Sequence, residues 1–299
     1  MVEWAERVSG PEVSRVGSSP AAAARWIRPL LSNLLTYLVL LSLAAITAGP
    51  FAYMVSMSLR PDFSFMYFPI GLIPERISLE NYAVLFQRSG ILRWLLNSFF
   101  VSTSVVLTNL ATSSLGGYAF ARGRFWRRDA IFLMLVASLM VPSTVTTVPL
   151  FIIVSRLGWA NTYMALILPS SANVFGTFLI RQQMMTIPRD YDDAAHIDGA
   201  GRFDIYLQVL LPLTKPALAT IATLSFLGAW NDFLWPLVAT SSGSMRTLTV
   251  GLATMVMRIG GAGFQLAGAT VAFLPTFIFF LLMQRYVVQG IAISGVTGT

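Results

Sequence analysis

The chain has 299 residues, of which 56% are hydrophobic and only 11% are charged, whereas soluble domains carry roughly 25% charged residues. Its mean hydropathy of +0.70 and several long uncharged runs exclude a water-soluble core and indicate an integral membrane protein. The net charge of +7 does not predict nucleic-acid binding, because the arginines flank apolar runs, where they set membrane orientation. Cysteine is absent and there is a single histidine, so we expect no disulfide, no metal site and no catalytic metal.

Residues 1–29 form a polar tail, which we expect to be poorly ordered. An uncharged run over 29–59 follows, far longer than the apolar region of a secretory signal peptide. Three glutamates precede the run, which also argues against a cleaved signal. We therefore predict a retained first transmembrane helix over 30–59.

Five further apolar segments predict a core domain over 94–289, followed by a short tail over 290–299. Ser78 to Tyr82 resembles the start of a short surface helix, and Gly116-Gly117 should let two helices approach closely. Pro142 and Pro149 should kink the third span. A Ser/Gly-rich connection is expected over 239–263. The five core spans are predicted over 94–121, 130–155, 163–180, 216–238 and 264–283.

Six spans place both termini on one side of the membrane. Thirteen of the 20 Lys and Arg residues lie on that side, in the N-terminal tail, the 122–128 turn, the 181–215 loop and at Arg285. The positive-inside rule therefore predicts that both termini and the 181–215 loop are cytoplasmic.

The polar loop over 188–212 has its own predicted architecture. Pro188 ends the preceding helix, Asp190 is expected to be an N-cap, and the carboxylate of Asp193 is positioned to satisfy free amides at the helix start. Gly199 and Gly201 then permit a sharp turn before a second short helix over about 202–210, which is closed by Pro212. The sequence therefore predicts a helix-turn-helix between two membrane spans.

Within this loop, the run from Asp193 to Ala200 reads DAAHIDGA, and Pro212 follows thirteen residues after Gly199. It resembles the EAA loop of binding-protein-dependent ABC importer permeases, E-A-A-x-x-D-G-A, with Asp193 in place of the Glu. In that family the loop docks into a cleft on a cytoplasmic ATPase subunit. The alternative is a solvated linker with a glycine turn. The resemblance implies these ATPase-coupling residues: Asp193, Ala194, Ala195, Asp198, Gly199, Ala200 and Pro212.

The runs over 230–237 and 284–290 extend the resemblance to the carbohydrate-uptake, maltose-type branch of these permeases. It implies a type I fold of six transmembrane helices in a bacterial or archaeal inner membrane. It also implies four partners besides the lipid bilayer: a second homologous permease chain, two ATPase subunits and an extracytoplasmic solute-binding protein. ATP and Mg would bind the ATPase, so this chain would be non-catalytic and hold no cofactor. The implied solute is a disaccharide or oligosaccharide, with glycerol phosphate or glycerophosphodiesters as the alternative.

The sequence has no phosphate-binding G-x-x-x-x-G-K-[ST] loop and no H-E-x-x-H motif. The energy for uphill transport must therefore come from outside this chain. A partner ATPase or an ion gradient could supply it. A gradient-driven carrier would usually show paired charges within its spans, and a membrane-embedded enzyme would need a cluster of His, Asp or Glu there. Only one carboxylate, Asp232, falls within a predicted span.

Four polar residues are candidates for the substrate pathway: Asn109, Asn173, Asn231 and Asp232. Three of them have a structural alternative. Asp232 could lie at the outer interface beside Trp230 and Trp235, since it follows Pro212 by a helix length of about 30 Å. The two asparagines at 109 and 173 could bridge helices. We also expect a neutral solute, because Arg156, Arg181 and Arg285 fall at predicted span ends.

Overall fold

The computed structural model describes residues 20–61, 76–88, 90–259 and 262–295, and every regular element in these ranges is helical. The all-α class is therefore confirmed. Four described helical segments are long and apolar enough to cross a membrane, and the number rises to six if each of two bent helix pairs is one span. The predicted tail residues 1–19 and 296–299 lie outside the described ranges.

The chain divides into two compact units, Met1–Tyr53 and Met54–Thr299. Most of helix α1 (Pro20–Ser58) belongs to the first unit. It begins at Pro20 rather than at residue 30, so the last part of the predicted tail is helical. Its Asn33–Ser58 segment is apolar, and the side chains over 33–48 are exposed, as suits a helix that faces lipid, whereas Met57 and Ser58 are buried.

The second unit is arranged around α3 (Ile91–Arg122), which matches the predicted second span. Its buried face carries polar as well as apolar residues. Helices α7 (Val174–Thr186) and α11 (Lys215–Asn231) pack on α3. A Cβ at Gly117 would lie 2.5 Å from Cγ2 of Ile180, so the predicted close approach of helices at this glycine is confirmed.

The remaining long helix, α14 (Ala262–Gly295), packs on α11. The rings of Phe226 and Phe279 stack with centroids 4.1 Å apart, and Nε1 of Trp230 donates to the carbonyl oxygen of Ala272 at 3.0 Å. Pro275 lies inside α14 without interrupting it. The helix continues through residues 290–295, which were predicted as part of the C-terminal tail.

Three predicted spans are broken rather than continuous, beginning with the third and fourth. The third consists of α4 (Arg128–Ser138) and α5 (Ser143–Arg156), which meet at an angle of 99°. A simple kink was therefore the wrong expectation: Pro142 disfavours helical geometry at the preceding residue, and the chain turns over 139–142. The fourth runs as α6 (Tyr163–Ile167), the 3₁₀ turn η1 (Leu168–Ser170) and α7, with a break at 171–173.

The region after α11 also departs from the predicted pattern. The helix ends at Asn231 and a short helix α12 (Leu234–Ala239) follows, so the predicted fifth span is interrupted at Asp232. The expected Ser/Gly-rich connection contains α13 (Leu248–Ile259), which composition alone did not reveal. Leu248 and Val250 of this helix are buried against the rest of the unit.

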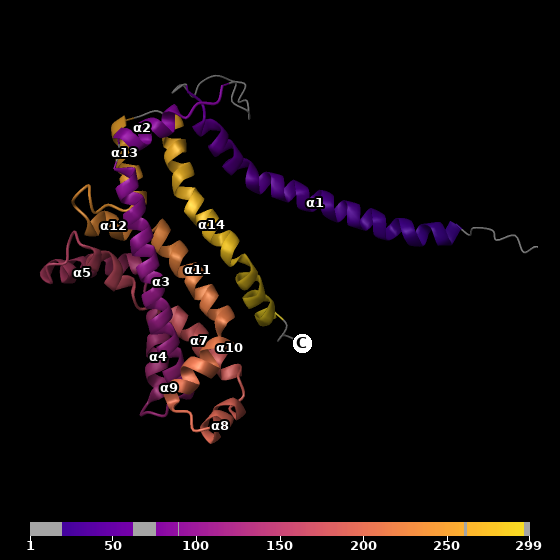
Figure 1. The fold of residues 1–299 in the computed structure, drawn as a ribbon, viewed down its shortest axis with the longest axis vertical. Coiled ribbons are helices and arrows are strands. Elements are labelled where there is room, and N and C mark those ends of the chain that lie inside the picture. Colours follow the sequence, from indigo (N-terminus) through magenta and orange to yellow (C-terminus); the bar gives the residue numbers. More distant parts are fainter. Residues whose placement is uncertain (1–19, 62–75, 89, 260–261, 296–299) are drawn as a thin grey trace, which may run out of the picture. The chain divides into compact units, whose positions relative to one another are not determined.

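Figure 1 shows short helices at each of the two ends of α3. At one end lie α13 and α2 (Glu80–Arg88), the predicted short surface helix. At the other end lie α8 (Asp190–Ile197) and α9 (Arg202–Asp204) of the predicted coupling loop.

Candidate coupling site

The N-cap of α8, the first helix of the loop, lies one residue earlier in the sequence than predicted. It is Arg189, which makes no side-chain capping bond, and Asp190 is the first helical residue, so the predicted Asp190 cap is wrong. Three aspartates occupy the first turn, at 190, 192 and 193, where their charges favour the positive end of the helix dipole.

The turn after α8 depends on Gly199, whose φ of +84° is in the left-handed region. The predicted sharp turn at Gly199 is confirmed, and its left-handed backbone disfavours a Cβ at this position. The amide of Gly199 donates to the carbonyl of His196 at 3.1 Å, and that of Ala200 donates to the carbonyl of Ala195 at 2.9 Å. These bonds satisfy two of the free carbonyls at the end of α8.

The second helix of the loop lies where it was predicted but has mixed geometry. It begins as α9, where Asp204 accepts a hydrogen bond from the amide of Gly201 at 3.0 Å. It continues as a π-helical segment, η2 (Ile205–Leu210), and ends in α10 (Leu211–Leu213). Pro212 lies inside α10 and does not close the helix as predicted. The chain then bends by 77° into α11.

Side chains from the last turns of α3 hold the loop in place. Nε of Arg122 lies 2.7 Å from Oδ2 of Asp192, and their side chains are only 8% and 15% exposed. Nη2 of Arg122 also donates to the carbonyl of Ile187 at 2.8 Å. An ion pair this deeply buried is costly to break, because either charge alone would be left desolvated.

Two tyrosine hydroxyls attach the second helix of the loop to α3. Tyr118 donates to the carbonyl of Arg202 at 2.9 Å, and the hydroxyls of Tyr206 and Ser114 lie 2.8 Å apart. Sequence reasoning missed these contacts, and it treated Arg122 only as an orientation signal. No local pattern pairs a residue at the end of one span with a loop far along the chain.

The two faces of α8 differ in what they contact. Ala195, together with Ala200, packs against a buried apolar cluster that includes Ile180, Met184 and Leu210. The predicted coupling residues Ala194 and Ala195 therefore lie on different faces of α8, because only Ala194 is exposed.

Outward from this cluster, the loop presents an apolar surface that we call the outer ridge: Tyr191, Ala194, Ile197 and Phe203. Ile197 is 86% exposed, more than either Phe203 or Tyr191. Asp193, Asp198 and Gly199 are also exposed, as is Pro212. No ion pair is formed by Asp193 or Asp198 with any residue that the structure describes. The loop is thus fixed on its inner side and apolar on its outer side.

Each of the four candidate pathway residues makes its own hydrogen bond. Asn109 is buried and donates from Nδ2 to Oγ of Ser225 at 3.1 Å, which bridges α3 and α11. Oδ1 of Asn173 caps α7 by accepting from the amide of Gly176 at 3.0 Å. Asn231 is exposed and bonds the carbonyl of Leu227 in its own helix, and Asp232 accepts from the amide of Trp235 at 3.4 Å. In the described ranges, no hydrogen bond joins any two of the four.

Comparison with known proteins gives this arrangement a family. Residues 113–293, more than half of the chain and including the whole loop, match the family described as binding-protein-dependent transport system inner membrane component. The chain belongs to this family.

Relatives of this permease align along nearly their full length. An arabinooligosaccharides transport system permease protein (AraQ) of Halalkalibacterium halodurans is 37% identical, with 90% of this chain and 98% of the relative aligned. An sn-glycerol-3-phosphate transport system permease protein (UgpE) of Brucella abortus is 32% identical, with 88% and 97% aligned. A multi-pass membrane subunit of an importer of this kind accounts for the apolar helices.

The fold of the permease is also that of a solved transporter. A chain from the crystal structure of a bacterial ABC transporter involved in the import of the acidic polysaccharide alginate superimposes with a TM-score of 0.74. The two chains are 22% identical, and the alignment covers 86% of this chain and 96% of the other. The type I permease architecture is therefore confirmed at the level of the fold.

At the end of α3 opposite the loop, a second polar network fixes the connection before α13. Asn97 donates from Nδ2 to the carbonyls of Ser244 and Arg246 at 2.8 and 2.9 Å, and accepts from the hydroxyl of Tyr163 at 2.7 Å. Trp94 donates from Nε1 to the carbonyl of Gly243 at 2.8 Å. Sequence reasoning missed Asn97 as an anchor.

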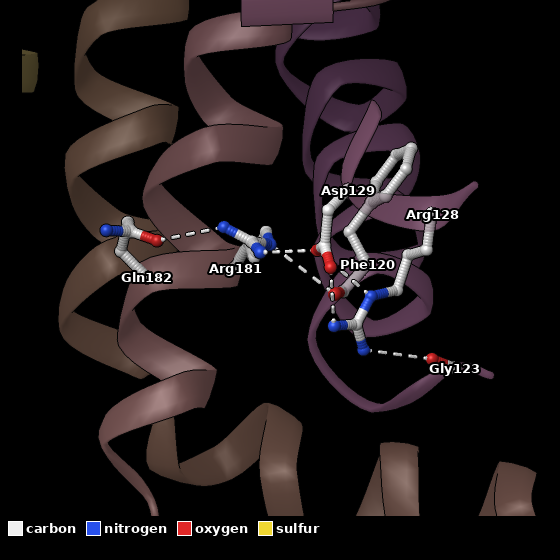
Figure 2. Close-up of polar contacts among 6 residues, drawn as sticks. All are labelled: Phe120, Gly123, Arg128, Asp129, Arg181 and Gln182. Atoms are coloured by element: carbon white, nitrogen blue, oxygen red, sulfur yellow. Dashed lines mark hydrogen bonds and ion pairs between the residues drawn. The ribbon is translucent and has the colours of Figure 1, made fainter. Parts of the chain in front are cut away.

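The charge of Arg181 is compensated by a carboxylate from the start of α4. Arg181 lies inside α7, which runs past the predicted end of the fourth span, and its side chain is 13% exposed. It pairs with Asp129 at 3.1 Å and lies 4.0 Å over the ring of Phe132, as Figure 2 shows in part. Among the residues that the structure describes, no cluster of His, Asp and Glu is arranged to hold a metal ion.

Proposed function

We propose that this permease forms half of the translocation pathway of an ATP-driven importer for a disaccharide or oligosaccharide. Its partners are a second homologous permease chain, two ATPase subunits and an extracytoplasmic solute-binding protein. ATP and Mg bind to the ATPase, and this chain is non-catalytic. Membership of the binding-protein-dependent family supports the assembly. The arabinooligosaccharide transporter relative supports the solute class.

The observation that carries the proposal is the division of α8 into two faces. Its inner face is joined to α3 through Arg122 and Asp192, and its outer ridge is apolar and exposed. We infer that the outer ridge inserts into a cleft on the ATPase, where Ile197 becomes buried. Movement of the ATPase is then transmitted to α3 through the buried ion pair and the tyrosine hydrogen bonds, because these contacts join the loop to α3.

The same proposal places both termini and α8 in the cytoplasm. The support is the distribution of Lys and Arg, with thirteen of 20 on that side. A reporter fused after Arg128 or Gly199 should therefore read cytoplasmic, and one fused after Ser244 should read extracytoplasmic. Cytoplasmic activity of the Ser244 fusion would contradict the six-span topology.

The solute is proposed to be neutral and rich in hydroxyl groups. Arg181, the arginine within α7, is already paired with Asp129 and so is not free to hold an anion. Glycerol phosphate or a glycerophosphodiester is the second candidate, favoured by the 32% identical Brucella abortus relative. Uptake of a labelled oligosaccharide by vesicles that contain the whole complex distinguishes the two candidates. Unlabelled oligosaccharides should inhibit this uptake. Uptake of a phosphate ester that sugars do not inhibit would favour the second candidate.

Co-purification distinguishes an ATP-driven importer from a gradient-driven carrier. The tagged permease, extracted in mild detergent, should bring with it a homologous permease and an ATPase in a one-to-two ratio of this chain to ATPase. Isolation of the chain alone, together with uptake that collapses when the ion gradient is dissipated, would reject the proposal.

A further inference from the structure

The turn between α3 and α4, over residues 123–127, and the first residues of α4 have no part in the proposed coupling contacts. They form a shallow, open depression lined by their own residues. Arg124, Trp126 and Arg127 project from it and are exposed, and the Trp126 side chain is 76% exposed. We call these three residues the basic turn. An exposed tryptophan between two arginines requires an explanation, because large aromatic side chains are rarely left in water.

The arginines of the basic turn differ from their neighbours in having no carboxylate partner. Arg122 pairs with Asp192, and Arg128 and Arg181 share Asp129 at 3.2 and 3.1 Å. Figure 2 shows that the carboxylate of Asp129 lies between these last two guanidinium groups. Over the described ranges, neither Arg124 nor Arg127 forms an ion pair. The one acidic side chain lining the depression is thus already neutralised, and the surface keeps an excess of positive charge.

The basic turn is also rigid enough to present a defined surface. Arg127 has a φ of +52°, in the left-handed region, and its guanidinium lies 4.2 Å over the ring of Trp126. Nη1 of Arg128 donates to the carbonyl of Gly123 at 3.2 Å, which closes the turn (Figure 2). Stacking on the indole holds Arg127 in place and leaves its hydrogen-bond donors free for an anion.

The position of the basic turn identifies the kind of anion. The turn joins the end of one apolar helix to the start of another, so it lies where the hydrocarbon of the membrane meets the headgroups. Helix α4 buries Phe132 against its neighbours, but presents Leu133 and Met134 outward, 68% and 66% exposed. Such a surface suits acyl chains, and a tryptophan at its edge is typical of the membrane interface.

We propose that the basic turn binds the headgroup phosphate of an anionic phospholipid, with Arg124 and Arg127 as the phosphate ligands. The acyl chains lie along the exposed face of α4, and Trp126 sits at the level of the headgroup. The proposal rests on the membrane placement that the family provides and not on the identity of the solute. Because Arg122 next to this turn is paired with Asp192 of α8, the lipid site adjoins the coupling loop.

The test uses the purified complex and native mass spectrometry, with phosphatidylglycerol and phosphatidylcholine of identical acyl chains as probes. The variant Arg124→Gln/Arg127→Gln should bind phosphatidylglycerol roughly 25-fold more weakly, about fivefold for each arginine. Its binding of phosphatidylcholine should not change. The control is Arg156→Gln, because Arg156 is also an exposed arginine at a helix end and forms no ion pair with a described residue. That control should bind both lipids as the unaltered complex does.

Three outcomes would overturn the proposal. Unchanged phosphatidylglycerol binding by the double variant would do so directly. Displacement of the lipid by inorganic phosphate alone would mean that the site takes a free anion. Loss of the ATPase with normal lipid binding would mean that the turn is a protein contact. The thermal midpoint of the double variant, which should be unchanged because both side chains are exposed, checks that the variant is folded.

Discussion

At one end of α3 the coupling loop is anchored only along its inner side. At the other end, hydrogen bonds from α3 side chains to three backbone carbonyls hold the connection before α13 in place. The coupling loop depends on charged and hydroxyl side chains, chiefly Arg122 with Asp192, and leaves an apolar ridge unused. The opposite connection depends on Asn97 and Trp94, which bond its carbonyls directly. The first arrangement suits a surface that must meet a partner and transmit force. The second suits a segment that must keep its shape.

The largest effect is expected from placing a charge on the outer ridge. Ile197→Asp should reduce ATPase retention by about thirtyfold or more and abolish coupled uptake, because a central apolar contact typically contributes about 2 kcal/mol or more to an interface. The matched control is Ile77→Asp: Ile77 is 76% exposed and precedes α2 by three positions in the sequence, and α2 lies at the other end of α3. It should retain the ATPase. Equal retention by both variants would mean that the ridge is not the docking surface.

Breaking the ion pair tests the inner side of the loop. Asp192→Ala should lower the free energy of unfolding by about 3 kcal/mol, because Arg122 remains buried without its partner. Asp190→Ala is the control, since Asp190 lies in the same helical turn but is exposed; it should cost less than about 1 kcal/mol. Unfolding of the purified protein in detergent measures both. Similar losses in the two variants would show that the dipole, rather than the pair, stabilises α8.

At the opposite end, Asn97→Leu should cost about 2 kcal/mol, because it leaves buried polar groups without hydrogen bonds. The same change at Asn231, which is exposed and bonds only its own helix, should have little effect. Limited proteolysis in the 240–247 segment is the measurement. Asn97→Leu should be cleaved there faster than the unaltered protein, and unchanged cleavage would mean that Asn97 does not hold the segment.

The smallest predicted effect concerns the turn that follows α8. Gly199→Ala should lower the free energy of unfolding by about 1 kcal/mol through backbone strain alone, since φ is +84° and a Cβ there would meet no atom within 4 Å. Gly228→Ala is the control: a Cβ there also meets nothing within 4 Å, but Gly228 lies within α11. Because alanine favours helix, this control should not lose stability. A loss at Gly228 equal to that at Gly199 would contradict the strain argument.

In the coupling loop, the sequence motif predicted the secondary structure but not the packing. The order DAAHIDGA predicted a helix, a turn at Gly199 and a second helix, and all three are present. It did not reveal which side of α8 faces the protein. Ala195 was expected to face a partner, but it packs against the protein's own apolar cluster. Replacing Ala195 with Arg would therefore unseat the loop itself, and Ile197 is the better test of docking.

By itself, the sequence determined the membrane class, the apolar segments and the coupling motif, because hydropathy and helix-stop signals are properties of neighbouring residues. Only the tertiary structure decided the breaks at 139–142 and at Asp232, the helix α13 and the anchors of both loops. Asn97 and the carbonyl of Ser244 are 147 positions apart, and no local pattern encodes their meeting. The physical reason is that a buried polar group takes whichever partner packing brings within reach, and packing is a property of the whole chain.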